Sequence, residues 1–118
     1  MKYVSYNGST GIKDGHHVCH QSNGGLVSGQ IVPGTTYSFN ANSYCLYVAN
    51  TKSLSRVTIV GSEGGGRLCF KVTDDGTATT VSVGSKATVN LDLTGISMLA
   101  YSTGTSTSGS KVKFTYTA

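Results

Sequence analysis

The chain has 118 residues, of which only 12% are charged, and a formal net charge of +4 from nine Lys and Arg against five Asp and Glu. This length suits one domain, because domains commonly run to ~100–150 residues. No apolar run of ~20 residues occurs, which excludes a transmembrane helix, and residues 1–8 lack the apolar stretch of a signal peptide. Glu63 is the only glutamate, while Gly, Thr and Val are abundant, so the composition favours strands over helices.

Strands are predicted along most of the first half, between clusters of turn residues. They cover residues 3–6, 16–20, 26–32, 35–39, 44–49 and 57–60. Residues 1–25 are the less regular part. Pro33-Gly34 predicts a type II turn, because Pro fixes its own φ and Gly accepts the positive φ that this turn requires.

Alternation is clearer in the second half, where strands are predicted at residues 68–72, 78–83, 87–93, 96–101 and 112–116. Ala87 to Leu93 alternates apolar and polar residues at a strict period of two, the pattern of a half-buried strand. Asp74-Asp75-Gly76 predicts a hairpin turn. Gly61 to Gly66 is a loop, since consecutive glycines cost too much backbone entropy inside a strand.

Many short strands with turn signals every ~8–12 residues predict a single all-β domain over residues 1–118, an antiparallel β-sandwich. A jelly roll is our first choice and an immunoglobulin-like sandwich the second, because the chain lacks Trp and the Cys-Trp-Cys spacing of immunoglobulin domains. No internal repeat points to a propeller or solenoid.

The positive charge is scattered along the chain. Only Lys111 and Lys113 share a strand face, and no basic run is interleaved with aromatic residues, so we expect no nucleic-acid partner. We interpret these two as solvated lysines of an edge strand, where lysine discourages pairing with another chain.

One local cluster contains the residue types that bind zinc: His16, His17, Cys19 and His20. On a strand, His16 and His20 face one side and His17 and Cys19 the other, so one chain offers at most two ligands per face. We therefore expect neither a metal nor another cofactor, and these four residues are candidates only if distant residues or further copies of the chain complete the set.

The three cysteines, Cys19, Cys45 and Cys69, are an odd number and do not describe a disulfide framework. We expect thiols in a protein made in a reducing cytoplasm. Cys45 and Cys69 fit small buried apolar positions, and the sequence leaves open whether they pair.

The carboxylates give no catalytic pair. Asp14, Asp74 and Asp75 are explained by turns, which leaves Asp92 and Glu63 without a turn explanation. A strand rather than a helix follows Gly61 to Gly66, which argues against a phosphate loop. No strained nucleophile motif is present either, so we do not expect an enzyme.

Binding surfaces remain as candidates. Thr88, Asn90 and Asp92 form a mostly uncharged polar face, suited to packing against another surface. Tyr44 and Tyr47 are the candidates for a sugar-stacking role. The aligned aromatic pairs elsewhere are interpreted as core: Tyr37 with Phe39, and Phe114 with Tyr116.

The segment Val32-Pro33-Gly34-Thr35-Thr36-Tyr37-Ser38-Phe39 resembles a strand-turn-strand of jelly-roll carbohydrate-binding modules and of related sandwich domains in phage tail and capsid proteins. Lys111 to Thr117 is similar to their closing strand. The resemblance implies a non-catalytic virion structural or accessory protein, such as a capsid decoration or tail-fibre protein. Its partners would be other virion proteins and copies of itself, with no membrane, and its location the virion, assembled in the host cytoplasm. The alternative is a carbohydrate-binding module or lectin that recognises glycans through Tyr and Asn.

Overall fold

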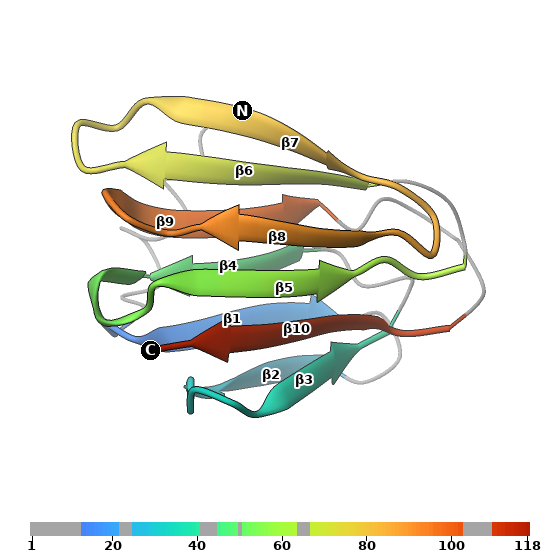
Figure 1. Cartoon of the computed structure of the whole chain (residues 1–118). Coiled ribbons are helices and arrows are strands. Elements are labelled where there is room, and N and C mark those ends of the chain that lie inside the picture. Colours follow the sequence, from blue (N-terminus) through green and yellow to red (C-terminus); the bar gives the residue numbers. More distant parts are fainter. Residues whose placement is uncertain (1–12, 22–24, 41–44, 50, 64–66, 103–109) are drawn as a thin grey trace.

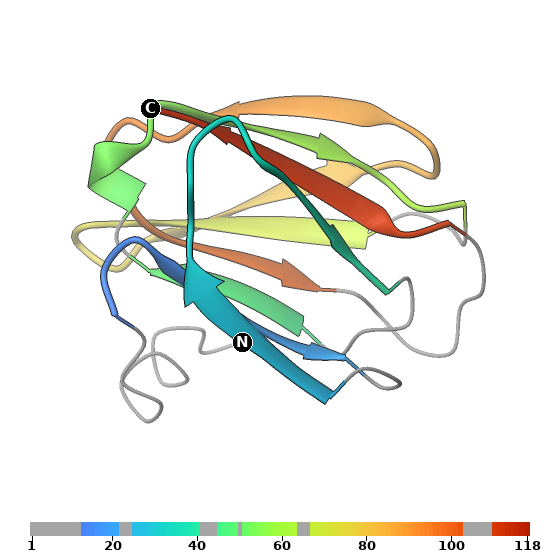
Figure 2. The same ribbon diagram turned by 90° about the horizontal axis from the view of Figure 1, so that it is seen from below.

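The computed structural model describes residues 13–21, 25–40, 45–49, 51–63, 67–102 and 110–118. Within these ranges the chain forms ten strands and one short 3-10 helix, η1 (Thr51–Ser53). The strands build two antiparallel sheets that lie face to face (Figures 1 and 2). The predicted all-β, two-sheet architecture is thus confirmed. No helix in the described part of the chain has the length and apolar character needed to cross a membrane.

The larger sheet has six strands. In order from one edge to the other, these are β2 (Gly25–Gln30), β1 (His16–Gln21), β4 (Cys45–Ala49), β9 (Ile96–Ser102), β6 (Arg67–Thr73) and β7 (Ala78–Val83). The smaller sheet has four, in the order β3 (Thr36–Phe39), β10 (Val112–Thr117), β5 (Arg56–Val60) and β8 (Thr88–Asp92).

Strands that follow one another in the sequence rarely lie in the same sheet. Among the described strands only the β1–β2 and β6–β7 hairpins stay within one sheet, and each other strand is followed by one in the opposite sheet. The last strand, β10, lies between β3 and β5 (Figure 1). Neighbours in each sheet are therefore mostly distant in sequence.

The strands predicted from residue 16 onward are confirmed, with ends that differ by at most two residues, whereas the candidate at residues 3–6 lies outside the described residues. Gly34 has a φ of +86°, and the N–H of Thr35 donates to the carbonyl of Val32 at 3.2 Å, as the predicted turn requires. The 3-10 helix η1 was not expected.

One interpretation from the sequence is wrong. Lys113 lies in β10, which pairs on both sides, and Lys111 immediately precedes that strand. Neither residue is therefore on an edge strand. The prediction failed because the order of the strands along the chain gives no indication that the last one is central.

The core fills the space between the sheets. Val112, Phe114 and Tyr116 point inward from β10, as predicted, and are at most 2% exposed. The ring of Phe114 lies edge-on to that of Tyr101 in the opposite sheet, with centroids 5.2 Å apart, and 5.8 Å from that of Phe39. Edge-on contacts are a favoured aromatic geometry. The Phe114–Tyr101 contact joins the two sheets, whereas Phe39 and Phe114 lie on neighbouring strands of one sheet.

A second apolar cluster lies on the other face of the six-stranded sheet. Phe70 is paired with Ala100, and Val72 with Met98, and each of the four is at most 9% exposed. Cys69, which precedes Phe70, points into the main core and is fully buried. Strand β6 therefore buries apolar side chains on both faces.

Candidate functional site

The outward side of the four-stranded sheet is a polar face, and we use that term for the outward side chains of β3, β10, β5 and β8. Seven of them are uncharged and polar: Thr36, Ser38, Thr58, Thr88, Asn90, Thr115 and Thr117. The other outward positions are Arg56, Val60, Asp92 and Lys113. The predicted candidates Thr88, Asn90 and Asp92 are all exposed and belong to this face.

One line of side chains crosses the polar face from edge to edge. The strand register places Thr36 opposite Thr115, Thr115 opposite Thr58, and Thr58 opposite Asn90. The hydroxyls of Thr36 and Thr115 are 2.8 Å apart, and the Thr58 hydroxyl donates to Oδ1 of Asn90 at 2.7 Å. We call these four residues the Thr/Asn row. Its internal hydrogen bonds hold the side chains in place before any partner binds.

Charges on the polar face are few and lie toward its ends. Arg56 is directly opposite Asp92. The Asp92 carboxylate accepts the backbone N–H of Thr94 at 2.9 Å, and this bond, followed by the hydroxyl of Thr94 and the charge of Arg56, lowers the Asp92 pKa. Asp92 therefore does have a turn role, contrary to the sequence interpretation, because its side chain caps the turn into β9.

The turn explanation is confirmed for Asp75. Its carboxylate accepts the hydroxyl of Thr73 and the N–H of Thr77, the latter at 3.0 Å, and these bonds lower its pKa. Its neighbour Asp74 instead lies 3.7 Å from the ammonium of Lys52. Asp75 thus stabilises the hairpin turn, whereas Asp74 forms an ion pair.

The aromatic candidates divide between core and undescribed positions. Tyr44 lies outside the described residues, as does the side chain of Tyr47. The pairs predicted to be core do face the interior: Phe39, Phe114 and Tyr116 are buried and Tyr37 is half-buried. Those rings are consequently not available on the polar face.

The four histidine and cysteine candidates are split by the strand as expected. His17 and Cys19 turn into the core, His16 lies on the opposite side, and the side chain of His20 is outside the described residues. Within the part of the chain that is described, no three His, Cys, Asp or Glu residues are grouped closely enough to hold a metal ion.

His17 lies instead in an aromatic environment. Its ring centroid is 5.0 Å from that of Tyr37 and 5.7 Å from that of Phe39, and its Nδ1 is buried without a hydrogen-bond partner. Burial, with a smaller contribution from the charge of His16, lowers the pKa of His17. The imidazole of His17 is thus neutral at neutral pH.

Cys69 carries a free thiol in the core, so it is not paired with Cys45. Burial raises its pKa to about 12, which keeps the thiol protonated and unreactive at neutral pH.

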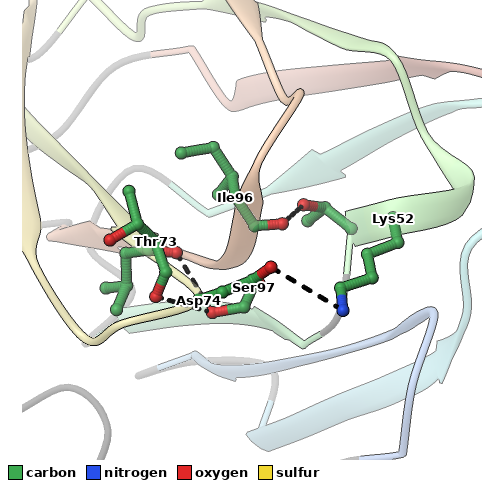
Figure 3. Close-up of polar contacts among 7 residues, drawn as sticks. Lys52, Thr73, Asp74, Ile96 and Ser97 are labelled. Atoms are coloured by element: carbon green, nitrogen blue, oxygen red, sulfur yellow. Dashed lines mark hydrogen bonds and ion pairs between the residues drawn. The ribbon is translucent and has the colours of Figure 1, made fainter.

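A second polar region surrounds η1 at one end of the sandwich (Figure 3). The buried hydroxyl of Thr51 donates to the carbonyl of Ile96, which ties η1 to β9. Ser97 donates to the carbonyls of Val72 and Thr73 at 3.2 and 3.1 Å, where β6 has an irregular register against β9. These contacts fix the end of the sandwich.

Two hollows, of about 400 and 460 Å³, flank η1 and share Lys52, Ser53 and Leu54 as lining residues. Lys52 and Asp74 both line the hollow of about 400 Å³. Their side chains are more than half exposed, so water strongly screens the ion pair between them. We therefore take the polar face as the candidate site.

Comparison of the chain with protein-family models, curated proteins and solved structures finds no match.

Sequence reasoning found one end of the Thr/Asn row and missed the rest. Thr36, Thr58 and Thr115 each occupy the polar side of an alternating strand, and that signal was available. The missing information was the strand order β3-β10-β5-β8, which brings residues from four separate segments into one line.

Proposed function

We propose that this chain is a non-catalytic attachment module, which uses the polar face to bind the surface of another protein in a larger assembly. Within that class we favour a phage virion accessory protein of the capsid-decoration or tail-fibre type. The proposal assigns no reaction to the chain.

The observation that carries the proposal is the Thr/Asn row. Its hydroxyl and amide groups are bonded to one another at 2.7–2.8 Å, so little side-chain freedom is lost when a partner packs against them. Thr58 and Thr115 are already half-buried between their neighbours. A face with few charges also avoids the cost of removing ions from water on association.

The strand connections favour a jelly roll within the sandwich class, and we include this topology in the proposal. Jelly rolls wind back and forth between two sheets, whereas immunoglobulin-like sandwiches keep several successive strands in one sheet. Here the described connections other than β1–β2 and β6–β7 pass from one sheet to the other.

A glycan-binding role is less favoured by the same face. Sugar recognition depends on aromatic rings that stack on the sugar, and Phe39, Phe114 and Tyr116 are turned into the core. The polar face itself carries hydroxyls, the Asn90 amide and three charged side chains, which offer hydrogen bonds without an aromatic stacking platform.

The test is incorporation into particles of the source system. Particles are purified on a density gradient from cells that express either the native chain or Asn90→Lys, and the chain is quantified by mass spectrometry. We expect the native chain to sediment with the particles. The amount of Asn90→Lys in the particle fractions should be at least about tenfold lower than that of the native chain. The new charge replaces the acceptor of the Thr58 hydroxyl and must be desolvated at the interface.

Ser28→Lys is the matched control, since Ser28 is exposed on a strand of the other sheet and receives the same charge. It should be incorporated like the native chain. A native chain absent from all particle fractions, or one that binds immobilised glycans as a monomer, would refute the proposal. Equal incorporation of Asn90→Lys would refute the role of the polar face.

A further inference from the structure

Among the described strands, four lie at the edges of the two sheets, and they differ in how well they are protected against pairing with another strand. Strand β3 has only four residues and follows Pro33, and β8 carries Asp92. Strand β2 contains Gly25 and Gly29, which weaken it as a pairing surface. Charges, proline and short length are the usual protections of an edge.

Strand β7 has none of these protections. Its six residues, Ala78–Val83, include no charged residue, no glycine and no proline, and most are β-branched. All six pair with β6 without a register shift, so the strand is regular over its whole length. Ala78, Thr79, Thr80 and Ser82 are exposed. In Figure 1 it forms the upper margin of the six-stranded sheet.

We propose that β7 pairs antiparallel with β7 of a second copy of this chain, so that the two six-stranded sheets become one continuous sheet. An edge strand leaves every second backbone N–H and C=O without a partner in the sheet, and strand addition supplies those partners. This association uses a different sheet from the polar face and does not depend on the proposed function.

The occupant is a second copy because the edge is self-complementary. In a twofold antiparallel pair centred on Thr80, that residue meets itself, Thr79 meets Val81, and Ala78 meets Ser82. No like charges meet, and the contacts match β-branched and small residues on each face. A strand pair of six residues buries less than the ~1,200 Å² of a standard stable interface, so we expect a dissociation constant in the micromolar range.

The experiment is sedimentation velocity on the full chain under reducing conditions, from ~5 to ~500 μM, the range that brackets a micromolar equilibrium. We expect a reversible monomer–dimer equilibrium that strengthens with added salt, because two copies of net charge +4 repel one another. Thr80→Lys places two lysines opposite each other at the axis and should weaken the dimer at least about tenfold. Ser28→Lys, on the other edge of the same sheet, should dimerise like the native chain, and so should Asn90→Lys.

A native chain that stays monomeric at every concentration overturns the proposal. So does a dimer that survives Thr80→Lys, or one that Ser28→Lys weakens equally. If Thr80→Lys does not fold, as judged by circular dichroism, amide hydrogen exchange of the native chain tests the β7 pairing instead. Slower exchange at high concentration in β7 supports the pairing, and concentration-independent exchange in β7 overturns it.

Discussion

At the scale of single residues, a tight steric constraint lies where the chain leaves β5. A Cβ atom on Gly61 would lie 2.3 Å from the carbonyl oxygen of Gly84, a backbone atom that cannot rotate away. The N–H of Gly61 also donates to the carbonyl of Ala87 at 2.8 Å. The loop predicted at this glycine is therefore anchored against the turn that precedes β8.

Gly61→Ala is expected to lower the free energy of unfolding by about 1–3 kcal/mol, because the backbone must shift to accept the methyl group. Urea denaturation measures the change. Gly29→Ala is the control: a Cβ there meets nothing within 4 Å, and stability should stay the same or rise slightly. Equal stabilities for the two variants would show that the approach of Gly61 to Gly84 is not a constraint.

At the scale of elements, apolar runs, alternation and turn signals predicted where the described strands lie, and alternation predicted which side of a strand is polar. Val112, Phe114 and Tyr116 were placed correctly for this reason, since side-chain direction follows from the period of two. Strand order depends instead on pairings such as Phe39 with Val112, between segments whose local sequences carry no mark of each other. The central position of Lys113 and most of the Thr/Asn row were consequently beyond prediction.

Two other features were missed because they depend on specific side-chain contacts. Thr51 is held in η1 through a hydrogen bond to Ile96, a residue 45 positions away. The capping role of Asp92 requires Thr94 to turn back toward it, which alternation within the strand does not reveal.

Strands β10 and β3 offer a comparison of two tyrosine hydroxyls. The Tyr116 hydroxyl is buried without a hydrogen-bond partner, whereas that of Tyr37 accepts the N–H of Val32 at 2.8 Å. Tyr116→Phe should leave the free energy of unfolding unchanged or raise it by up to ~1 kcal/mol, because no bond is lost. Tyr37→Phe should lower it by about 1 kcal/mol. Urea denaturation of both variants checks this, and a larger loss for Tyr116→Phe would contradict the description of its hydroxyl.

At the scale of the whole molecule, stability should depend on pH through His17. Its pKa in the folded chain lies below the ordinary value of 6.5, so the unfolded chain binds a proton more readily. The contribution of the neutral His17 imidazole to the free energy of unfolding is thus fully present above pH 6.5 and is lost as the pH falls below that value. The lowered pKa values of Asp75 and Asp92 act in a separate window, below their ordinary 3.8.

We therefore expect the melting temperature to fall between pH 7.5 and 5, and calorimetry measures it directly. His17→Phe, which keeps a flat ring beside Tyr37 and Phe39, should flatten the curve in this window. A native melting temperature that is constant from pH 7.5 to 5, or an unchanged slope in the variant, would contradict the assignment to His17.

The position of β10 also affects the order in which the chain can fold. Strand β3 pairs with β10 among the described strands, and Phe39 finds its partner in Val112. During synthesis β3 emerges early and then lacks its neighbour until β10 has been made. Pairings across such long separations are slow to form, and unpaired strand edges favour aggregation meanwhile. The yield of folded protein should therefore be governed by the time between synthesis of these two strands.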